Sequence, residues 1–248
     1  MFETLSYISN KPRGNIESWF LESKSKFDEF DFLKAPVPFD VELVNQYQNY
    51  FPESKKWREL FTHIAWFHGT RCNDQNLFEE GLLPLGRRIN TIWDYLYSIV
   101  KSDVSEEEWN IFKNHMSGTY AKLYHSKISD PKYWGPYAML IKDIFFVSES
   151  VGNHNYLQIP EIVEDIIFCF SNFRPNVDLK NRYKASTTPC IVKFIAPIDE
   201  IDYLNPLLNY LYTEFHNAEH TLDSNTCYDG KGRAIMSEAI ISVEYIGR

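Results

Sequence analysis

Apolar side chains recur three to four positions apart through the first quarter of the chain, a spacing typical of helices that bury one face. Asp40 and Ser54 stand at the starts of two of these segments, where helix N-caps are expected. Pro36 and Pro38 separate the first segment from the second, because proline interrupts a helix. The pattern predicts a helical N-terminal region, with helices over residues 15–31, 40–51 and 54–62.

Strand-like runs follow. An apolar segment ends at Phe67 and leads into the tetrad His68-Gly69-Thr70-Arg71, which predicts a strand and then a turn, with His68 at the open end of the strand. Residues 76–82 predict a short helix that ends at Gly81. Two later strands are predicted, one in the proline-bounded run 190–196 and the last one over 234–246.

Four further helices are expected among these strands. The second of them begins with a capping box from Ser105 to Glu108, and the third begins with Asp130 followed by Pro131 at the first helical position. Because the strands lie scattered among helices without regular alternation, the fold class predicted is α+β. The helices are expected over residues 88–101, 105–126, 131–142 and 206–219.

Composition narrows the function classes. Hydrophobic residues make up 44% of the 248 residues, enough for a sizeable core. The net charge of -9 argues against a broad cationic surface for nucleic acid and leaves a local basic groove open. The cysteines show neither a zinc spacing nor a disulfide framework, and no apolar stretch could span a bilayer. We therefore expect a cytoplasmic protein with no membrane partner and no metal.

Aromatic residues make up 16% of the chain, and many tyrosines and tryptophans cluster between Trp93 and Tyr137. Such rings pack helical cores or receive planar bases. The sequence leaves both roles open.

Three stretches of the chain resemble segments of one protein family. Trp66–Arg71 resembles the His-Gly-Thr segment by which diphtheria-toxin-like and poly(ADP-ribose) polymerase-like ADP-ribosyltransferases hold NAD+. Residues 144–150 resemble the strand and following helix that carry the nicotinamide-stacking aromatic of that family, and 236–246 resembles the late strand that begins at its catalytic glutamate. The resemblance implies the ADP-ribosyltransferase fold, with a split mixed β-sheet core and flanking helices in one domain over 1–248. Residues 1–60 would be a helical elaboration, and 86–143 a helical insertion.

The same resemblance assigns catalysis to Glu238 and His68. Glu238 would bond the 2'-hydroxyl of the nicotinamide ribose and stabilise the positive charge that develops as the glycosidic bond breaks. His68 would bond the adenosine ribose, while the backbone of Gly69 would meet the carboxamide, an approach that glycine permits. Phe145 and Tyr156, eleven positions apart, would sandwich the nicotinamide ring.

The remaining NAD+-binding candidates are polar. Thr70 would fix the turn, and Arg71 would pair with the pyrophosphate, because a guanidinium matches phosphate oxygens. Arg87 and Arg88 are further candidates for that pairing, and Asn153 and Ser150 are candidates for the carboxamide.

Two positions depart from the patterns of the family. Phe145 stands where the family generally has tyrosine, so the flat face is kept and the hydroxyl is lost. Met236 stands where members that modify arginine carry a second glutamate, so arginine side chains are not the expected acceptor.

The expected function is an NAD+-dependent mono-ADP-ribosyltransferase with NAD+ as co-substrate. Its acceptor would be a protein or a nucleic acid, and by analogy it would serve as a bacterial toxin or anti-phage effector, with an inhibitory or antitoxin protein as a further partner. One alternative is a module that binds NAD+ or a partner without turnover. The other is a zinc metalloprotease, because His216, Glu219 and His220 form an H-x-x-E-H string whose histidines would share one helical face.

Overall fold

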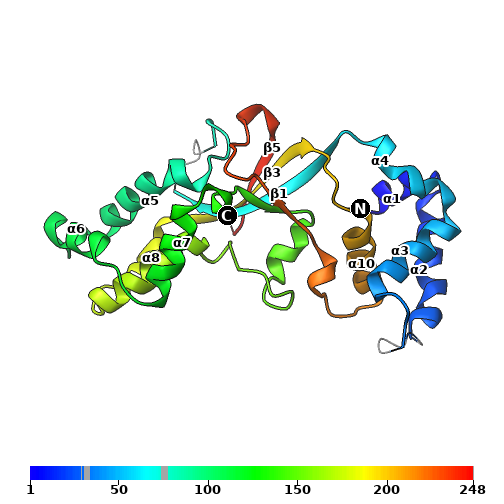
Figure 1. Cartoon of the computed structure of the whole chain (residues 1–248), viewed down its shortest axis with the longest axis horizontal. Helices are drawn as coiled ribbons and strands as arrows, with labels where there is room; N and C mark the ends of the chain where they lie inside the picture. The colour runs from blue at the N-terminus through cyan, green and yellow to red at the C-terminus, as the bar shows by residue number, and fades with distance from the viewer. Residues whose placement is uncertain (29, 31–33, 74–77, 248) are drawn as a thin grey trace. The chain divides into compact units, whose positions relative to one another are not determined.

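The computed structural model describes residues 1–28, 30, 34–73 and 78–247, which form an α+β protein (Figure 1). The chain folds into two compact units. The single domain expected from the sequence stays a prediction, because a domain is a unit of independent folding and a compact unit need not be one. Unit 1 comprises Met1–Ala65, Phe146–Asn153 and Ala196–Thr226, and unit 2 comprises Trp66–Phe145, His154–Ile195 and Cys227–Arg248.

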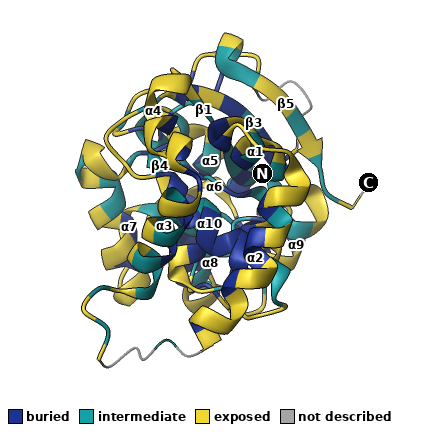
Figure 2. Cartoon of the chain, turned by 90° about the vertical axis from the view of Figure 1, so that its right-hand side faces the viewer, coloured by how far each residue is buried: buried dark blue, intermediate teal, exposed yellow. Residues whose placement is uncertain are grey.

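Unit 1 is built from helices around an aromatic core. Trp19, Phe20 and Tyr47 are buried there, and the rings of Phe20 and Phe215 stack with centroids 5.7 Å apart. Figure 2 shows buried residues gathered on α10. The helices are α1 (Phe2–Ser9), α2 (Arg13–Asp28), α3 (Phe39–Tyr50), η1 (Pro52–Lys56), α4 (Trp57–Leu60), α10 (Leu204–Phe215) and η4 (Leu222–Ser224).

The N-terminal helical region is confirmed in outline, but both expected N-caps are wrong. The N-cap of α3 is Pro38, and Asp40 lies in the first turn, where its Oδ2 accepts from Asn205 Nδ2 at 2.6 Å. Ser54 lies inside η1, because Pro52 starts that helix two residues earlier. Its hydroxyl donates to the carbonyl of Phe51 at 2.7 Å. Helix α1 was not expected from the sequence.

One five-stranded sheet has the strand order β4-β2-β1-β3-β5. The three pairs with described register, β1 with β2, β2 with β4 and β3 with β5, are antiparallel, so the mixed sheet expected from the resemblance is not seen in them. The predicted strand 190–196 lies within β3. The last strand, β5, is shorter than the predicted range 234–246, and β4 was not expected from the sequence. The strands are β1 (His63–Cys72), β2 (Tyr137–Met139), β3 (Thr188–Pro197), β4 (Cys227–Asp229) and β5 (Ile240–Tyr245).

The helices of unit 2 bury a second core. Trp93, Trp109, Phe112 and Phe170 pack there, so the first two tryptophans of the aromatic cluster are core residues. The predicted capping box at the start of α6 is confirmed. The helices are α5 (Leu85–Val100), α6 (Glu106–Asn114), α7 (Thr119–Ser129), α8 (Glu161–Phe173) and α9 (Leu179–Ser186).

Two predicted helices of this region need correction. The segment 105–126 is interrupted before α7, where Gly118 has φ 91°, a conformation that glycine adopts readily. The segment 131–142 is not an α-helix, because Gly135 has φ 57° and Pro136 has no N–H to donate. It forms instead the short helix η2 (Pro131–Tyr133), strand β2 and the start of η3 (Lys142–Phe146). Asp130 caps η2, with its side chain accepting from the N–H of Lys132.

Helices α8 and α9 were not expected from the sequence. The apolar positions 162, 163, 166, 167 and 170 repeat at helical spacing after Pro160, a signal that predicts α8. In the part of the chain that the structure describes, no helix has the length and apolar character needed to cross a membrane.

Candidate functional site

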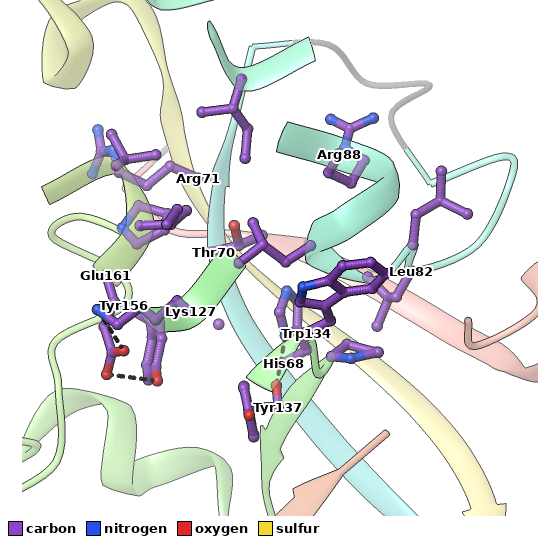
Figure 3. A pocket seen from close by; sticks show the side chains of 18 of the residues that line it. His68, Thr70, Arg71, Leu82, Arg88, Lys127, Trp134, Tyr137, Tyr156 and Glu161 are labelled. Carbon is purple, nitrogen blue, oxygen red and sulfur yellow. Dashed lines mark hydrogen bonds and ion pairs between the residues drawn. The ribbon is translucent and has the colours of Figure 1, made fainter. Parts of the chain in front are cut away.

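A cleft of about 230 Å³ opens in unit 2. Its wall comes from β1, the segment 78–83, the start of α5, the end of α7, the segment before β2, the start of α8 and α9 (Figure 3). Its lining residues with polar or aromatic side chains are His68, Thr70, Arg71, Phe78, Arg88, Lys127, Tyr133, Trp134, Tyr137, Tyr156, Glu161 and Tyr183.

His68 is one of the polar residues that line this cleft. Its Nδ1 lies 2.6 Å from the carbonyl oxygen of Tyr137. A carbonyl only accepts, so the proton is on Nδ1 and the neutral ring keeps a lone pair on Nε2. Burial lowers the pKa of His68, and the hydrogen bond to Tyr137 opposes this shift more weakly. The ring is therefore neutral near pH 7 and can accept a hydrogen bond.

The predicted turn at residues 68–71 is wrong. All four residues belong to β1, which continues to Cys72, so His68 lies inside the strand instead of at its end. The strand persists because its neighbours in the sheet, β2 and β3, pair with the backbone of β1. Of the predicted helix 76–82, residues 76 and 77 lie outside the described residues, and 78–80 form a turn before Gly81.

Gly69 lies under the ring of Phe145. A Cβ added at Gly69 would lie 2.3 Å from Phe145 Cε1, so only glycine admits this contact. Phe145 is buried in η3, which replaces the predicted strand, and it is not among the residues that line the cleft. The structure therefore places Phe145 in the core, where its apolar ring packs, and does not bring it to face Tyr156 across the cleft.

Tyr156 lines the cleft and joins a charged network. Its hydroxyl donates to Glu161 Oε1 at 3.2 Å, and Lys127 Nζ lies 3.3 Å from Glu161 Oε2 and 2.8 Å from Asp165 Oδ2. Burial, together with the neighbouring Glu161, raises the pKa of Tyr156, so its hydroxyl stays protonated and donates. Glu161 occupies the first position of α8, where the helix dipole favours an anion. Glu161 was not among the site residues expected from the sequence, although Pro160 before it is a helix-start signal.

Arg71 lines the cleft, but most of its donors are used within the protein. Nε donates to Thr187 Oγ1, Nη1 to the carbonyl of Leu157, and Nη2 to the carbonyls of Lys184 and Thr187, at 2.7 to 2.9 Å. A guanidinium has five N–H groups, so one on Nη1 is left for a ligand. The side chain is mainly a structural tie.

Arg88 is the freer cation of the cleft. It extends from α5 and also lines a second, adjoining pocket together with Arg71. Within the described residues Arg88 makes no hydrogen bond or ion pair, while burial lowers its pKa and the charge of Glu80 raises it by less. Arg87 is exposed and does not line the cleft.

Glu238 is not brought into the cleft. It lies in η5 (Ser237–Ala239), directly before β5, and its side chain is exposed. Its segment passes the cleft wall at Ile235, whose backbone exchanges hydrogen bonds of 2.8 and 3.0 Å with Leu82. Gly81 and Leu82 line the cleft, whereas Glu238 and the exposed Met236 do not.

Asn153 and Ser150 belong to unit 1, not to the unit that holds the cleft. The N–H of Asn153 donates to the carbonyl of Ser148 at 2.9 Å, and the hydroxyl of Ser150 donates to the carbonyl of Val147 at 2.8 Å. Both residues therefore serve local turns, and neither is among the residues that line the cleft.

The H-x-x-E-H string lies beyond the end of a helix. Helix α10 ends at Phe215 with His216 as its C-cap, so His216 and His220 do not share a helical face. The ring of His220 is held by Thr213 Oγ1 at 2.8 Å and by Glu214 Oε1 at 2.7 Å. Among the described residues, no group of three or more His, Cys, Asp or Glu side chains could hold a metal ion. The zinc alternative loses its geometric basis.

No family model matches this chain, and neither the search of curated proteins nor that of solved structures found a match.

Proposed function

We propose that this chain is an NAD+-dependent mono-ADP-ribosyltransferase with the fold of that family, and that the cleft around His68 is its dinucleotide site. One observation carries the proposal. The tetrad 68–71 and Tyr156, which are distant in the sequence and were both expected to hold NAD+, line the same cleft. The functional assignment beyond that cleft comes from the resemblance of the motifs.

The chemistry requires an anion close to the reacting sugar. Loss of nicotinamide leaves positive charge on the ribose carbon and its ring oxygen, and a fixed carboxylate stabilises that charge. Among the described residues that line the cleft, Glu161 is the sole carboxylate, and Tyr156 and Lys127 hold it in place. Glu161 is therefore the candidate that the geometry favours, while Glu238 is the candidate that the motif favours.

The other groups of the cleft fit the rest of a dinucleotide. Nε2 of the neutral His68 can accept a hydrogen bond from a ribose hydroxyl. Arg88 offers a cation without a protein partner among the described residues, and a guanidinium pairs well with phosphate oxygens. Arg71 contributes its charge and a single N–H.

The test uses NAD+ labelled in its adenosine part, incubated with the protein and a cell lysate. Release of nicotinamide reports cleavage, and protease or nuclease digestion of the labelled product identifies the acceptor class. Glu161→Gln and Glu238→Gln are compared with Glu219→Gln, an exposed glutamate in the other unit. We expect Glu161→Gln to lower the rate about 100-fold or more and the control to leave it unchanged. A loss confined to Glu238→Gln would transfer the role to that residue.

A second candidate function is a nucleotide-binding module without turnover. It is favoured by the ring of Phe145, which packs on Gly69 instead of facing the cleft, and by the exposure of Glu238. Tight NAD+ binding by calorimetry, with no nicotinamide released over a day, would select this function over transfer.

The biological setting belongs to the same proposal. The acceptor is a protein or a nucleic acid, and the enzyme acts in the cytoplasm as a toxin or anti-phage effector that an inhibitory protein restrains. This setting follows by analogy with small transferases of the class.

A further inference from the structure

Trp134 is held rigidly in the wall of the cleft. Its indole Nε1 donates to the carbonyl of Ile128 at 3.2 Å, and its own carbonyl accepts from the N–H of Leu85 at 2.9 Å. The side chain is half-buried and lines the cleft, as His68 does (Figure 3). The ring is therefore fixed in position before any ligand binds.

Gly86 in the first turn of α5 provides the seat for this ring. A Cβ added there would lie 2.3 Å from Trp134 Cζ3 and 2.4 Å from Cη2. The backbone of Gly86 has no positive φ, so the helix itself does not require glycine, and glycine in a helix costs about 0.5–1 kcal/mol relative to alanine. The close approach of the indole accounts for glycine at this position.

Trp134 differs in this respect from the other tryptophans of its region. Trp93 and Trp109 are buried in the core of unit 2, whereas Trp134 packs on Gly86 and still contributes to the lining of the cleft, as do its neighbours Tyr133 and Tyr137. A fixed aromatic surface in an open cleft is the arrangement on which flat bases stack. Phe145, which was expected to stack on the ligand, is buried against Gly69.

We propose that Trp134, seated on Gly86, is the platform on which the flat heteroaromatic ring of the bound nucleotide stacks. The inference rests on the proposed function, because it takes a nucleotide as the ligand. The ring is the adenine or the nicotinamide of NAD+, which share this stacking chemistry.

The test measures dissociation constants of AMP, ADP-ribose and nicotinamide mononucleotide by calorimetry. The variants are Trp134→Ala, Trp134→Phe and Gly86→Ala, with Tyr7→Ala, an exposed aromatic of unit 1, as control. We expect Trp134→Ala to weaken the binding of the fragment that carries the stacked ring about 5- to 150-fold. Trp134→Phe should retain most of the affinity for that fragment. Gly86→Ala keeps the indole but displaces it, so this variant is expected to bind the same fragment more weakly than wild type. The fragment affected identifies the ring.

Ligand NMR distinguishes stacking from a structural role of Trp134. Protons of the stacked ring should move upfield in the wild type because of the indole ring current, and this shift should disappear in Trp134→Ala. Thermal unfolding of each variant shows whether it is folded. If wild type binds the fragments while Trp134→Ala and Gly86→Ala bind all of them equally well, the inference fails and the proposed function stands. If wild type binds none of them, the proposed function fails, and the inference with it.

Discussion

One hydrogen bond decides what His68 can do in the cleft. Because the N–H at Nδ1 donates to the Tyr137 carbonyl, the lone pair on Nε2 is the single acceptor that the ring has left. Protonation at Nε2 would turn that acceptor into a donor and place a charge where burial disfavours it. The neutral form is thus the one that suits both the fold and a ribose hydroxyl.

This arrangement predicts a pH dependence of stability. The pKa of His68 is lowered from 6.5 in the folded protein, so the unfolded chain takes up the proton first as the pH falls. The contribution of the neutral ring to stability is complete above pH 6.5 and is lost progressively below it, down to the folded pKa. We expect wild type to lose more free energy of unfolding than His68→Asn between pH 7.5 and pH 5.5 in urea titrations.

Comparing wild type with His68→Asn removes the contributions that other titratable groups make to the pH dependence of stability. His216 also has a pKa lowered by burial, with the same sign of effect, but it is present in both proteins and cancels. The asparagine side chain of the variant keeps an N–H donor and does not titrate. Equal losses in the two proteins would mean that His68 is not held neutral by the fold.

At the scale of elements, Arg71 ties together parts of unit 2 that lie far apart in the sequence. From β1 it reaches Leu157 before α8, Lys184 near the C-terminus of α9, and Thr187 before β3. The last carbonyls of a helix lack partners within the helix and favour a cation. The side chain of Arg71 thereby caps the C-terminus of α9 and links this helix to β1, the central strand of the sheet.

We therefore expect Arg71→Lys to be costly although the charge is kept. Lysine cannot reproduce the fork of four donated bonds, so several acceptors lose a charged partner. The loss should be about 2–4 kcal/mol in the free energy of unfolding, measured in urea. Arg87→Lys, at an exposed position in α5, is the control and should change stability by less than about 0.5 kcal/mol. A similar loss of free energy of unfolding in both variants would show that the hydrogen bonds of Arg71 contribute little to stability.

The elements that the sequence predicted well are those with strong local signals. Helix α5 follows its apolar periodicity, and α6 follows its capping box, because both signals act within a few residues. The helix expected over 131–142 does not form at Gly135 and Pro136, because glycine and proline together favour a break in a helix. The end of α10 at Phe215 is not marked by glycine or proline, so the H-x-x-E-H string looked helical.

Of the residues that line the cleft, the sequence named the tetrad 68–71, Arg88 and Tyr156, but not Glu161 or Trp134. The tetrad 68–71 is contiguous, so one motif identified it. Glu161 and Trp134 enter the cleft only through the packing of α7 and α8 and the close approach of Trp134 to Gly86, which no local pattern encodes. Phe145 is aromatic, as a stacking residue must be, and it lies in contact with Gly69, yet its ring is buried.

At the scale of the whole molecule, the charge of the cleft departs from that of the chain. The chain carries a net charge of -9, whereas the charged residues described in the cleft wall are Arg71, Arg88, Lys127 and Glu161. The lining itself carries three cations and one carboxylate, and Asp165, 2.8 Å from Lys127, offsets part of this positive charge. The overall charge therefore does not exclude a phosphate-bearing ligand.

The described residues that line the cleft all belong to unit 2, which predicts where ligand binding is felt. A ligand that binds only the folded state suppresses the local opening that exchanges amide hydrogens. With saturating ADP-ribose, hydrogen exchange by mass spectrometry should slow in β1, the first turn of α5, the segment 133–137 and the start of α8. Exchange in α1, α2 and α3 should stay unchanged, because these helices belong to unit 1. Slowing confined to unit 1, with unit 2 unaffected, would place the nucleotide outside the cleft and remove the basis for the roles of His68, Glu161 and Trp134 together.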